Sequence, residues 1–152
     1  MLPFKNILSP TDFSEHSYKA ITVANELALY FGATLCVLHV VSLTPILVSS
    51  PTAPAFDIAT YQERLETNAR AELQGLVARL VSKEVKECEP MVTTGSYADE
   101  IIRIANERKS DLIVIGTRGR TGFPHLLLGS VAERVVQLAP CPVLTIGKAT
   151  EV

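Results

Sequence analysis

Short apolar runs alternate with longer amphipathic segments along the chain. The apolar runs have the length of strands and cover residues 6–9, 34–41, about 88–93, 111–115 and 142–146. In the segments between them, apolar residues recur every three or four positions, which predicts helices. This alternation is typical of repeated βαβ units, in which helices cover both faces of a parallel sheet. The pattern therefore predicts an α/β fold in β-α-β-α-β-α-β-α-β order.

Local signals mark the ends of several elements. The first strand is expected to end at Pro10, and Ser14 is suited to be the N-cap of a first helix that Gly32 ends. Ser96, followed three residues later by Asp99, approximates a capping box for the third helix. That helix should turn one apolar stripe toward the sheet, namely Ile101, Ile102 and Ala105. The fourth helix is expected over residues 131–138.

The chemistry at the strand ends favours one strand order. Open parallel sheets bind ligands beyond the carboxyl ends of their strands, where the strand order reverses. The first strand is followed by Pro10, Thr11 and Asp12, and the fourth by a glycine-rich segment that begins at Gly116. The end of the third strand, residues 93–96, is less well equipped. We therefore expect the first and fourth strands to be neighbours, in a single open, doubly wound, five-stranded parallel sheet of order 3-2-1-4-5 rather than 2-1-3-4-5.

Domain organisation follows from length and from the distribution of proline. A chain of 152 residues suits one domain, and no linker or repeat divides it. Pro90 places the third strand at an edge of the sheet, because proline cannot donate a ladder hydrogen bond. Residues 42–57 contain three prolines among small residues, so a long, mobile surface loop is expected there.

Composition excludes several classes of protein. The net charge of −2 and pI of about 5.9 provide no overall positive field, so nucleic-acid binding is not expected. No apolar run is long enough to span a bilayer and no secretory signal is found, which predicts a cytoplasmic protein. The three cysteines have no metal-ligand spacing, and buried structural thiols at Cys36 and Cys141 are favoured over a redox or metal role.

The segment from Gly116 to Ser130 has the character of a phosphate site. Glycines let the backbone approach a ligand closely, and Gly129-Ser130 opens a helix whose free amides and dipole favour an anion. The segment has neither the Gly-Lys-[Ser/Thr] of a Walker A loop nor a Gly-x-Gly-x-x-Gly fingerprint. The spacing alone leaves a second interpretation open, in which these glycines only turn the chain and cap helices.

One family resemblance covers nearly the whole chain. The pattern Gly116-x2-Gly119-x9-Gly129-Ser130 is similar to the Gly-x2-Gly-x9-Gly-[Ser/Thr] ATP-binding pattern of the universal stress protein family. Residues 6–14, 38–40, 111–119, 128–135 and 140–145 also resemble that family, in the same order. The resemblance is to the ATP-binding branch, and it implies ATP, with Mg²⁺, as the ligand.

The resemblance also implies which residues contact the nucleotide. Asp12 would meet the ribose hydroxyls or a bound Mg²⁺, and the backbone of Val40 would read the adenine edge, a role that rests on resemblance alone. The other base and ribose contacts would be Pro10, Thr11, Ile115 and Gly116. The phosphate contacts would be Gly119, Gly129, Ser130 and the amide of Val131.

Several of these residues have a second interpretation. Asp12 is also suited to a turn or N-cap, but beside the glycine pattern the ligand role is favoured. Ser130 is equally suited to plain helix capping, and it can serve both purposes at once. Arg118 and Arg120 could bind phosphate or lie solvated at the surface. His39 is interpreted as a structural histidine of its strand rather than as a catalyst, and His16 and His125 are undecided.

Three hypotheses for function follow. The segment contains no Lys, and no second carboxylate accompanies Asp12, so no catalytic residue is named and slow ATP hydrolysis at most is expected. The leading hypothesis is a nucleotide-dependent regulatory protein of the stress response. The alternatives are an ATP-using hydrolase or adenylyl transferase, and a dimeric interaction module that needs no nucleotide. The last strand, between Pro142 and Ile146, would be an edge strand, and both its exposure and the family resemblance favour a homodimer through it.

Overall fold

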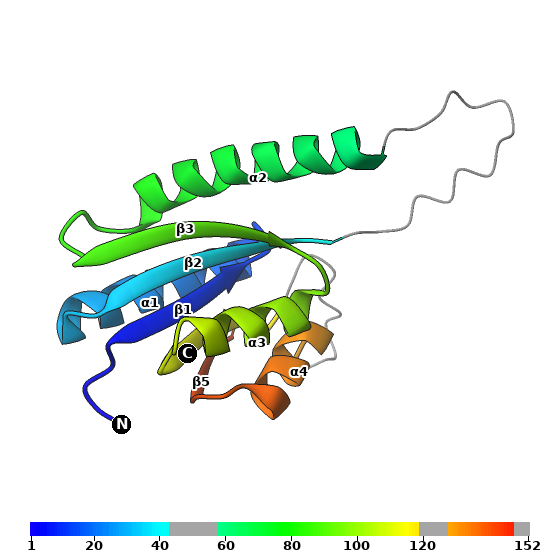
Figure 1. Ribbon diagram of the computed structural model, residues 1–152. Coiled ribbons are helices and arrows are strands. Elements are labelled where there is room, and N and C mark those ends of the chain that lie inside the picture. The colour runs from blue at the N-terminus through cyan, green and yellow to red at the C-terminus, as the bar shows by residue number, and fades with distance from the viewer. Residues whose placement is uncertain (43–57, 119–127, 148–152) are drawn as a thin grey trace, which may run out of the picture.

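The computed structural model describes residues 1–42, 58–118 and 128–147. Its five strands form one parallel sheet in the order β3-β2-β1-β4-β5, so the predicted fold class and strand order are confirmed (Figure 1). The strands are β1 (Asn6–Thr11), β2 (Thr34–Val41), β3 (Glu87–Thr94), β4 (Leu112–Gly116) and β5 (Val143–Ile146). The helices are α1 (Glu15–Phe31), α2 (Ile58–Leu80), α3 (Tyr97–Glu107) and α4 (Ser130–Leu138).

Helices cover both faces of the sheet because the central strands are apolar on both faces. Successive strand side chains point to opposite sides. Ile7, Leu35 and Val114 pack toward α1 and α2. Leu8, Leu38 and Ile113 pack toward α3 and α4, on the opposite side of the sheet (Figure 1). Each of these side chains is almost fully buried, which stabilises the fold by roughly 1.5–3 kcal/mol per residue.

Helix α1 begins and ends where the sequence predicts. The Ser14 Oγ accepts a hydrogen bond from the amide of Ser17 at 3.3 Å, and Gly32 ends the helix with φ = +65°. Its buried stripe consists largely of alanines, Ala20, Ala24 and Ala28. Their small size lets α1 pack closely against β1 and β4, the strands that flank the reversal of strand order.

Helix α3 corrects two predictions. Ser96 is the N-cap, but its side chain makes no capping bond within the described residues, and Asp99 instead accepts a hydrogen bond from Arg134 of α4 at 3.0 Å. The predicted capping box is therefore wrong. The inward stripe includes Ile104 in place of Ile102, which is only half-buried. The helical spacing explains this, since Ile104 lies three residues from Ile101 and shares its face.

Other boundaries differ by small amounts. Strand β1 continues through Pro10 to Thr11, and α4 starts one residue earlier than predicted, at Ser130. Of the cysteines, Cys36 is buried as expected, whereas Cys141 is half-buried. The predicted loop lies outside the described residues except for Ser42, as do Gly119 and Arg120. No helix within the described ranges combines the length and the apolar character that crossing a membrane requires.

Candidate functional site

The ladder between β1 and β4 ends early. The two strands pair only at Ile7 with Leu112 and at Leu8 with Ile113. One residue further on, the buried hydroxyl of Ser9 donates a hydrogen bond to the carbonyl of Val114 at 3.0 Å. A side chain thus satisfies a carbonyl that a longer ladder would have paired. Beyond these pairs, the carboxyl ends of β1 and β4 form no ladder with one another, and this is the place where the strand order reverses.

This early ending explains how Pro10 fits into a central strand. Pro10 is buried and pairs in register with Leu38 of β2. Backbone groups of successive strand residues point alternately to the two neighbouring strands. The Val41 carbonyl accepts from the Gly95 amide, so the backbone groups of Val41 point toward β3. Because this direction alternates along each strand, the in-register pairing of β2 with β1 places the Pro10 nitrogen on the β4 side. Since the β1–β4 ladder has already ended there, the missing N–H leaves no ladder bond unmade.

The turn after β1 has a well-determined set of hydrogen bonds. The Ser17 hydroxyl donates to the Ser14 carbonyl at 2.7 Å, so it accepts from the Thr11 hydroxyl, which lies 2.7 Å away. The Thr11 hydroxyl oxygen also accepts a hydrogen bond from the amide of Phe13 at 3.0 Å. The Thr11 side chain is buried in this network, so the contact that the sequence predicts between Thr11 and a nucleoside would be made through its backbone.

Asp12 takes part in the same turn. Its Oδ1 accepts a hydrogen bond from the amide of Ser14 at 3.0 Å, which is the turn role that the sequence left open. A carboxylate has two oxygens, each with two lone pairs, so this bond is compatible with a ligand contact through Oδ2. The ligand role of Asp12 stays a prediction.

Val40 presents its backbone to the same region. β1 pairs with β2 only as far as Thr11 with His39, whereas β2 continues to Val41. Because Val41 turns its carbonyl toward β3, the carbonyl of Val40 points to the β1 side, beyond the last paired position of β1. A carbonyl in that position could accept from an exocyclic amine such as that of adenine.

The end of β4 packs directly on α1. A Cβ added at Gly116 would lie 3.0 Å from the His16 carbonyl oxygen and 3.2 Å from the His16 carbonyl carbon. The glycine therefore permits a close backbone approach between β4 and the first turn of α1. Ile115 beside it is buried, and Arg118, two residues further on, is half-buried.

The start of α4 is fixed beside this strand end. The amide of Gly129 donates to the carbonyl of Thr117 at 2.6 Å, while the Thr117 amide donates to Ile146 of β5. Gly129 is the N-cap, so the prediction that Ser130 could be the cap is wrong and Ser130 is the first helical residue. The amides of Ser130 and Val131 have no acceptor within the helix, and they lie at the positive end of its dipole.

The structure therefore brings most predicted site residues to one edge of the sheet. Pro10, Thr11 and Asp12 lie at the end of β1, between Val40 of β2 and the pair Ile115 and Gly116 of β4, and Thr117 joins the start of α4 to that pair. Gly119 lies outside the described residues. Sequence reasoning missed Ser9, although a hydroxyl inside an apolar strand is a signal that could have identified it. It also missed the contact between Phe13 and His39, which only the fold brings together.

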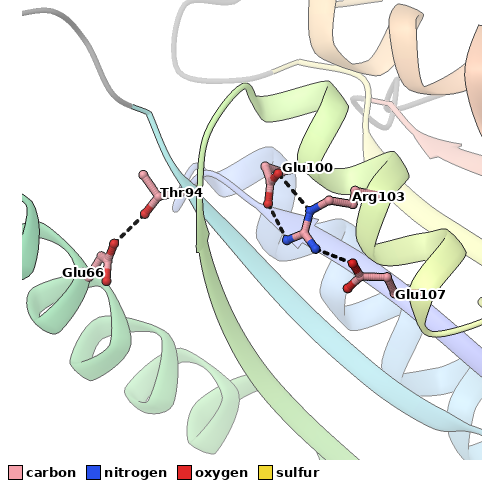
Figure 2. Close-up of polar contacts among 5 residues, drawn as sticks. All are labelled: Glu66, Thr94, Glu100, Arg103 and Glu107. Atoms are coloured by element: carbon pink, nitrogen blue, oxygen red, sulfur yellow. Dashed lines mark hydrogen bonds and ion pairs between the residues drawn. The ribbon is translucent and has the colours of Figure 1, made fainter.

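Two groups of polar contacts lie near the carboxyl end of β3, which β2 separates from β1 and β4 (Figure 2). The Thr94 hydroxyl donates to Glu66 of α2 at 2.7 Å, and this bond, with a second from Gln62, lowers the pKa of Glu66. On α3, Arg103 binds both Glu100 and Glu107, and its hydrogen bonds lower the pKa of Glu100. The first group fixes α2 to the sheet and the second supports α3. In the described part of the chain, no three His, Cys, Asp or Glu side chains are grouped as metal ligands.

Comparison with known proteins gives a consistent result. The model of the Universal stress protein family matches residues 3–147. Universal stress protein MJ0531 of Methanocaldococcus jannaschii is 35% identical, over 95% of this chain and 83% of its own length. The solved structure of MJ0577 from the same organism superposes with a TM-score of 0.81 at 26% identity, covering 97% of this chain and 99% of that one.

Two further solved structures contain nucleotides. A universal stress protein in complex with cAMP has a TM-score of 0.69 at 23% identity and covers 96% of this chain and 98% of its own. The universal stress protein of Archaeoglobus fulgidus in complex with dAMP has a TM-score of 0.61 at 24% identity and covers 96% and 99%. At these identities the likeness is one of fold.

Proposed function

Since this chain belongs to the universal stress protein family, we propose that it is a cytoplasmic regulatory protein that binds ATP, with Mg²⁺, at the carboxyl ends of β1, β2 and β4. One observation carries the proposal. The bond from Gly129 to Thr117 holds the positive end of α4 at the end of β4, next to the point where β4 stops pairing with β1. An anionic phosphate is the ligand that such a helix end favours.

The described residues fit the parts of a nucleotide. The amides of Ser130 and Val131 would donate to phosphate oxygens, and Gly129 would let the phosphates approach the backbone. The Val40 carbonyl would accept from the adenine amine, and Asp12 Oδ2 would accept from the ribose hydroxyls or hold Mg²⁺. The cAMP and dAMP complexes of proteins with this fold support an adenine nucleotide as the ligand.

Regulation, with slow hydrolysis at most, is the role that this chemistry favours. Fast phosphoryl transfer requires cationic charge around the γ-phosphate and a group that orients the nucleophile. The residues assigned to the phosphates are mainly backbone amides and one hydroxyl, which bind an anion without activating a nucleophile. Occupancy of the site would then alter the surface that α4 and β5 offer to partners.

Substitution of two glycines tests the proposal. Gly129→Leu places a bulky side chain at the phosphate position, and its φ of −68° and ψ of 158° are open to any residue, so the fold should survive. Gly119→Leu tests the other glycine of the pattern. We expect both variants to lose ATP binding in calorimetric titration while keeping the wild-type circular dichroism spectrum. The proposal is wrong if both variants bind ATP with the wild-type Kd.

A second role, as a homodimer through β5, is favoured by the exposed edge. β5 is a four-residue edge strand without charge, and its Leu144 is 38% exposed. Val136 and Leu138 of the neighbouring α4 are also exposed. The other edge strand, β3, carries Glu87 and Pro90, which discourage pairing. We expect sedimentation velocity to show a dimer that Leu144→Lys dissociates, and a wild-type monomer at micromolar concentration would contradict this.

A further inference from the structure

Phe13 has an unusual backbone conformation at the edge of the proposed site. It follows Asp12 directly and has φ = +62°, in the left-handed region that bulky residues rarely adopt. Such conformations persist only where the surrounding structure holds them, and they cluster at binding sites. The contacts of Phe13 therefore indicate which side chain of the turn is held in position.

His39 of β2 contacts this turn at two points, in addition to the hydrogen bonds within the turn itself. Its ring stacks on the Phe13 ring, with centroids 4.3 Å apart and planes at 29°. Its Nδ1 lies 2.9 Å from the carbonyl oxygen of Thr11. A carbonyl oxygen can only accept, so Nδ1 carries the hydrogen of this bond.

The two contacts of His39 bracket Asp12. One fixes the carbonyl of the residue before it, and the other fixes the side chain of the residue after it. The Asp12 carboxylate is held in addition by the amide of Ser14. The residues on both sides of Asp12 are thus in contact with one residue of the neighbouring strand, 27 positions further along the chain than Asp12.

From this arrangement we propose that His39 is a positioning residue of the nucleotide site, which holds the Asp12 carboxylate toward the ribose hydroxyls and so makes binding selective for nucleotides with an intact ribose. The proposal rests on the proposed function. A carboxylate that accepts from a hydroxyl distinguishes ATP from an analogue without that hydroxyl, because the analogue cannot donate that hydrogen bond. The selectivity therefore depends on where the carboxylate points.

Two matched variants separate the contacts of His39. His39→Asn keeps an N–H donor near the position of Nδ1 but removes the ring, whereas His39→Phe keeps a ring to stack on Phe13 but removes the donor. Phe13→Gly is a third variant, since glycine adopts a positive φ freely; it removes the stack together with the packing of the Phe13 ring against the core. Each variant is titrated calorimetrically with ATP and with 2′,3′-dideoxy-ATP in the presence of Mg²⁺.

The measured quantity is the ratio of the two Kd values. Wild type should prefer ATP by roughly 10- to 100-fold, the range that one hydrogen bond to a charged group provides. His39→Asn should keep most of that preference. His39→Phe should bring the ratio toward one, with the Kd for the dideoxy analogue changed by no more than about twofold. Phe13→Gly should give an intermediate ratio. If His39→Phe does not fold, the ratio for Phe13→Gly tests whether the contact with His39 positions Asp12.

Other outcomes overturn the proposal and can be told apart. A His39→Phe variant that keeps the wild-type ratio shows that His39 does not position Asp12, and nucleotide binding by wild type then stands unaffected. An equal loss of affinity for both nucleotides shows a purely structural role. A wild type that binds both nucleotides equally removes the ribose contact, and a wild type that binds neither overturns the proposed function as well.

Discussion

Gly116→Ala tests the close approach between β4 and α1 most sharply. The added methyl group would lie 3.0 Å from the His16 carbonyl oxygen, 3.2 Å from its carbon and 3.4 Å from the Ser17 nitrogen. All three atoms belong to the backbone of the first turn of α1, so no flexible side chain can move aside. Because protein interiors are close-packed, either the helix or the strand must shift by a few tenths of an ångström.

The size of the effect follows from that crowding. Forcing one extra carbon into a well-packed site destabilises a protein by about 1–3 kcal/mol. For a chain of this length each kcal/mol lowers Tm by roughly 2–4 °C, so Gly116→Ala should lower Tm by roughly 2–12 °C. The variant should also bind ATP more weakly, because the first turn of α1 follows directly on Asp12 and Phe13.

Gly75→Ala is the matched control. Gly75 lies inside α2, where an added Cβ would meet nothing within 4 Å beyond the backbone of its own helix. Alanine is the better helix former, so this variant should be more stable by about 0.5–1 kcal/mol. Thermal unfolding monitored by circular dichroism measures both variants. If Gly116→Ala melts at or above the wild-type temperature, the close approach inferred at the end of β4 is wrong.

Three further predictions concern stability and reactivity. Ser9→Ala removes the only described donor to the buried Val114 carbonyl and should reduce the free energy of unfolding by about 1–3 kcal/mol in urea; an unchanged midpoint would contradict the role given to Ser9. The pKa of Glu66 is lowered in the folded state by Thr94, so its stabilisation is present at neutral pH and is lost as the pH falls below about 4; Thr94→Val should weaken that dependence, and equal pH profiles of the urea midpoints would refute it. Burial raises the pKa of the Cys36 thiol to about 11, so Cys36 should be alkylated only when the protein opens, and mass spectrometry showing labelling at the rate of a free cysteine would contradict this.

The fold could be predicted because its signals are local and mutually consistent. Ser14 and Gly32 define the ends of α1 by their own side-chain and backbone chemistry, and Pro90 identifies an edge strand by its missing donor. The strand order followed from the polar residues after the first and fourth strands, because a ligand site requires those two ends to be adjacent.

The predictions that failed depend on partners distant in the sequence. Asp99 has the spacing of a capping residue, but the guanidinium of Arg134 on α4 binds it instead. Pro10 looked like the end of a strand, because nothing local shows that the β1–β4 ladder has already ended when β1 reaches it. Neither competing contact can be recognised before the strand order and the register are known.

In the candidate site, too, some features could be predicted from local sequence and others depend on the fold. The glycine pattern around Gly129 and the polar residues after β1 could be read from the sequence, since glycine and a helix start have their own chemistry. The orientation of the Val40 carbonyl depends on the register of β2 against both of its neighbours, so the sequence offered it only through family resemblance. The bracketing of Asp12 by His39 likewise required two strands to be placed side by side.

ATP binding at the carboxyl ends of the strands can be measured without any variant, from the small molecules that the purified protein carries. Freshly purified protein is denatured, the released molecules are separated by chromatography, and adenine nucleotide is quantified per chain. We expect near-stoichiometric ATP or ADP. Recovery of no nucleotide, followed by no binding of added Mg·ATP to the intact protein, would contradict it.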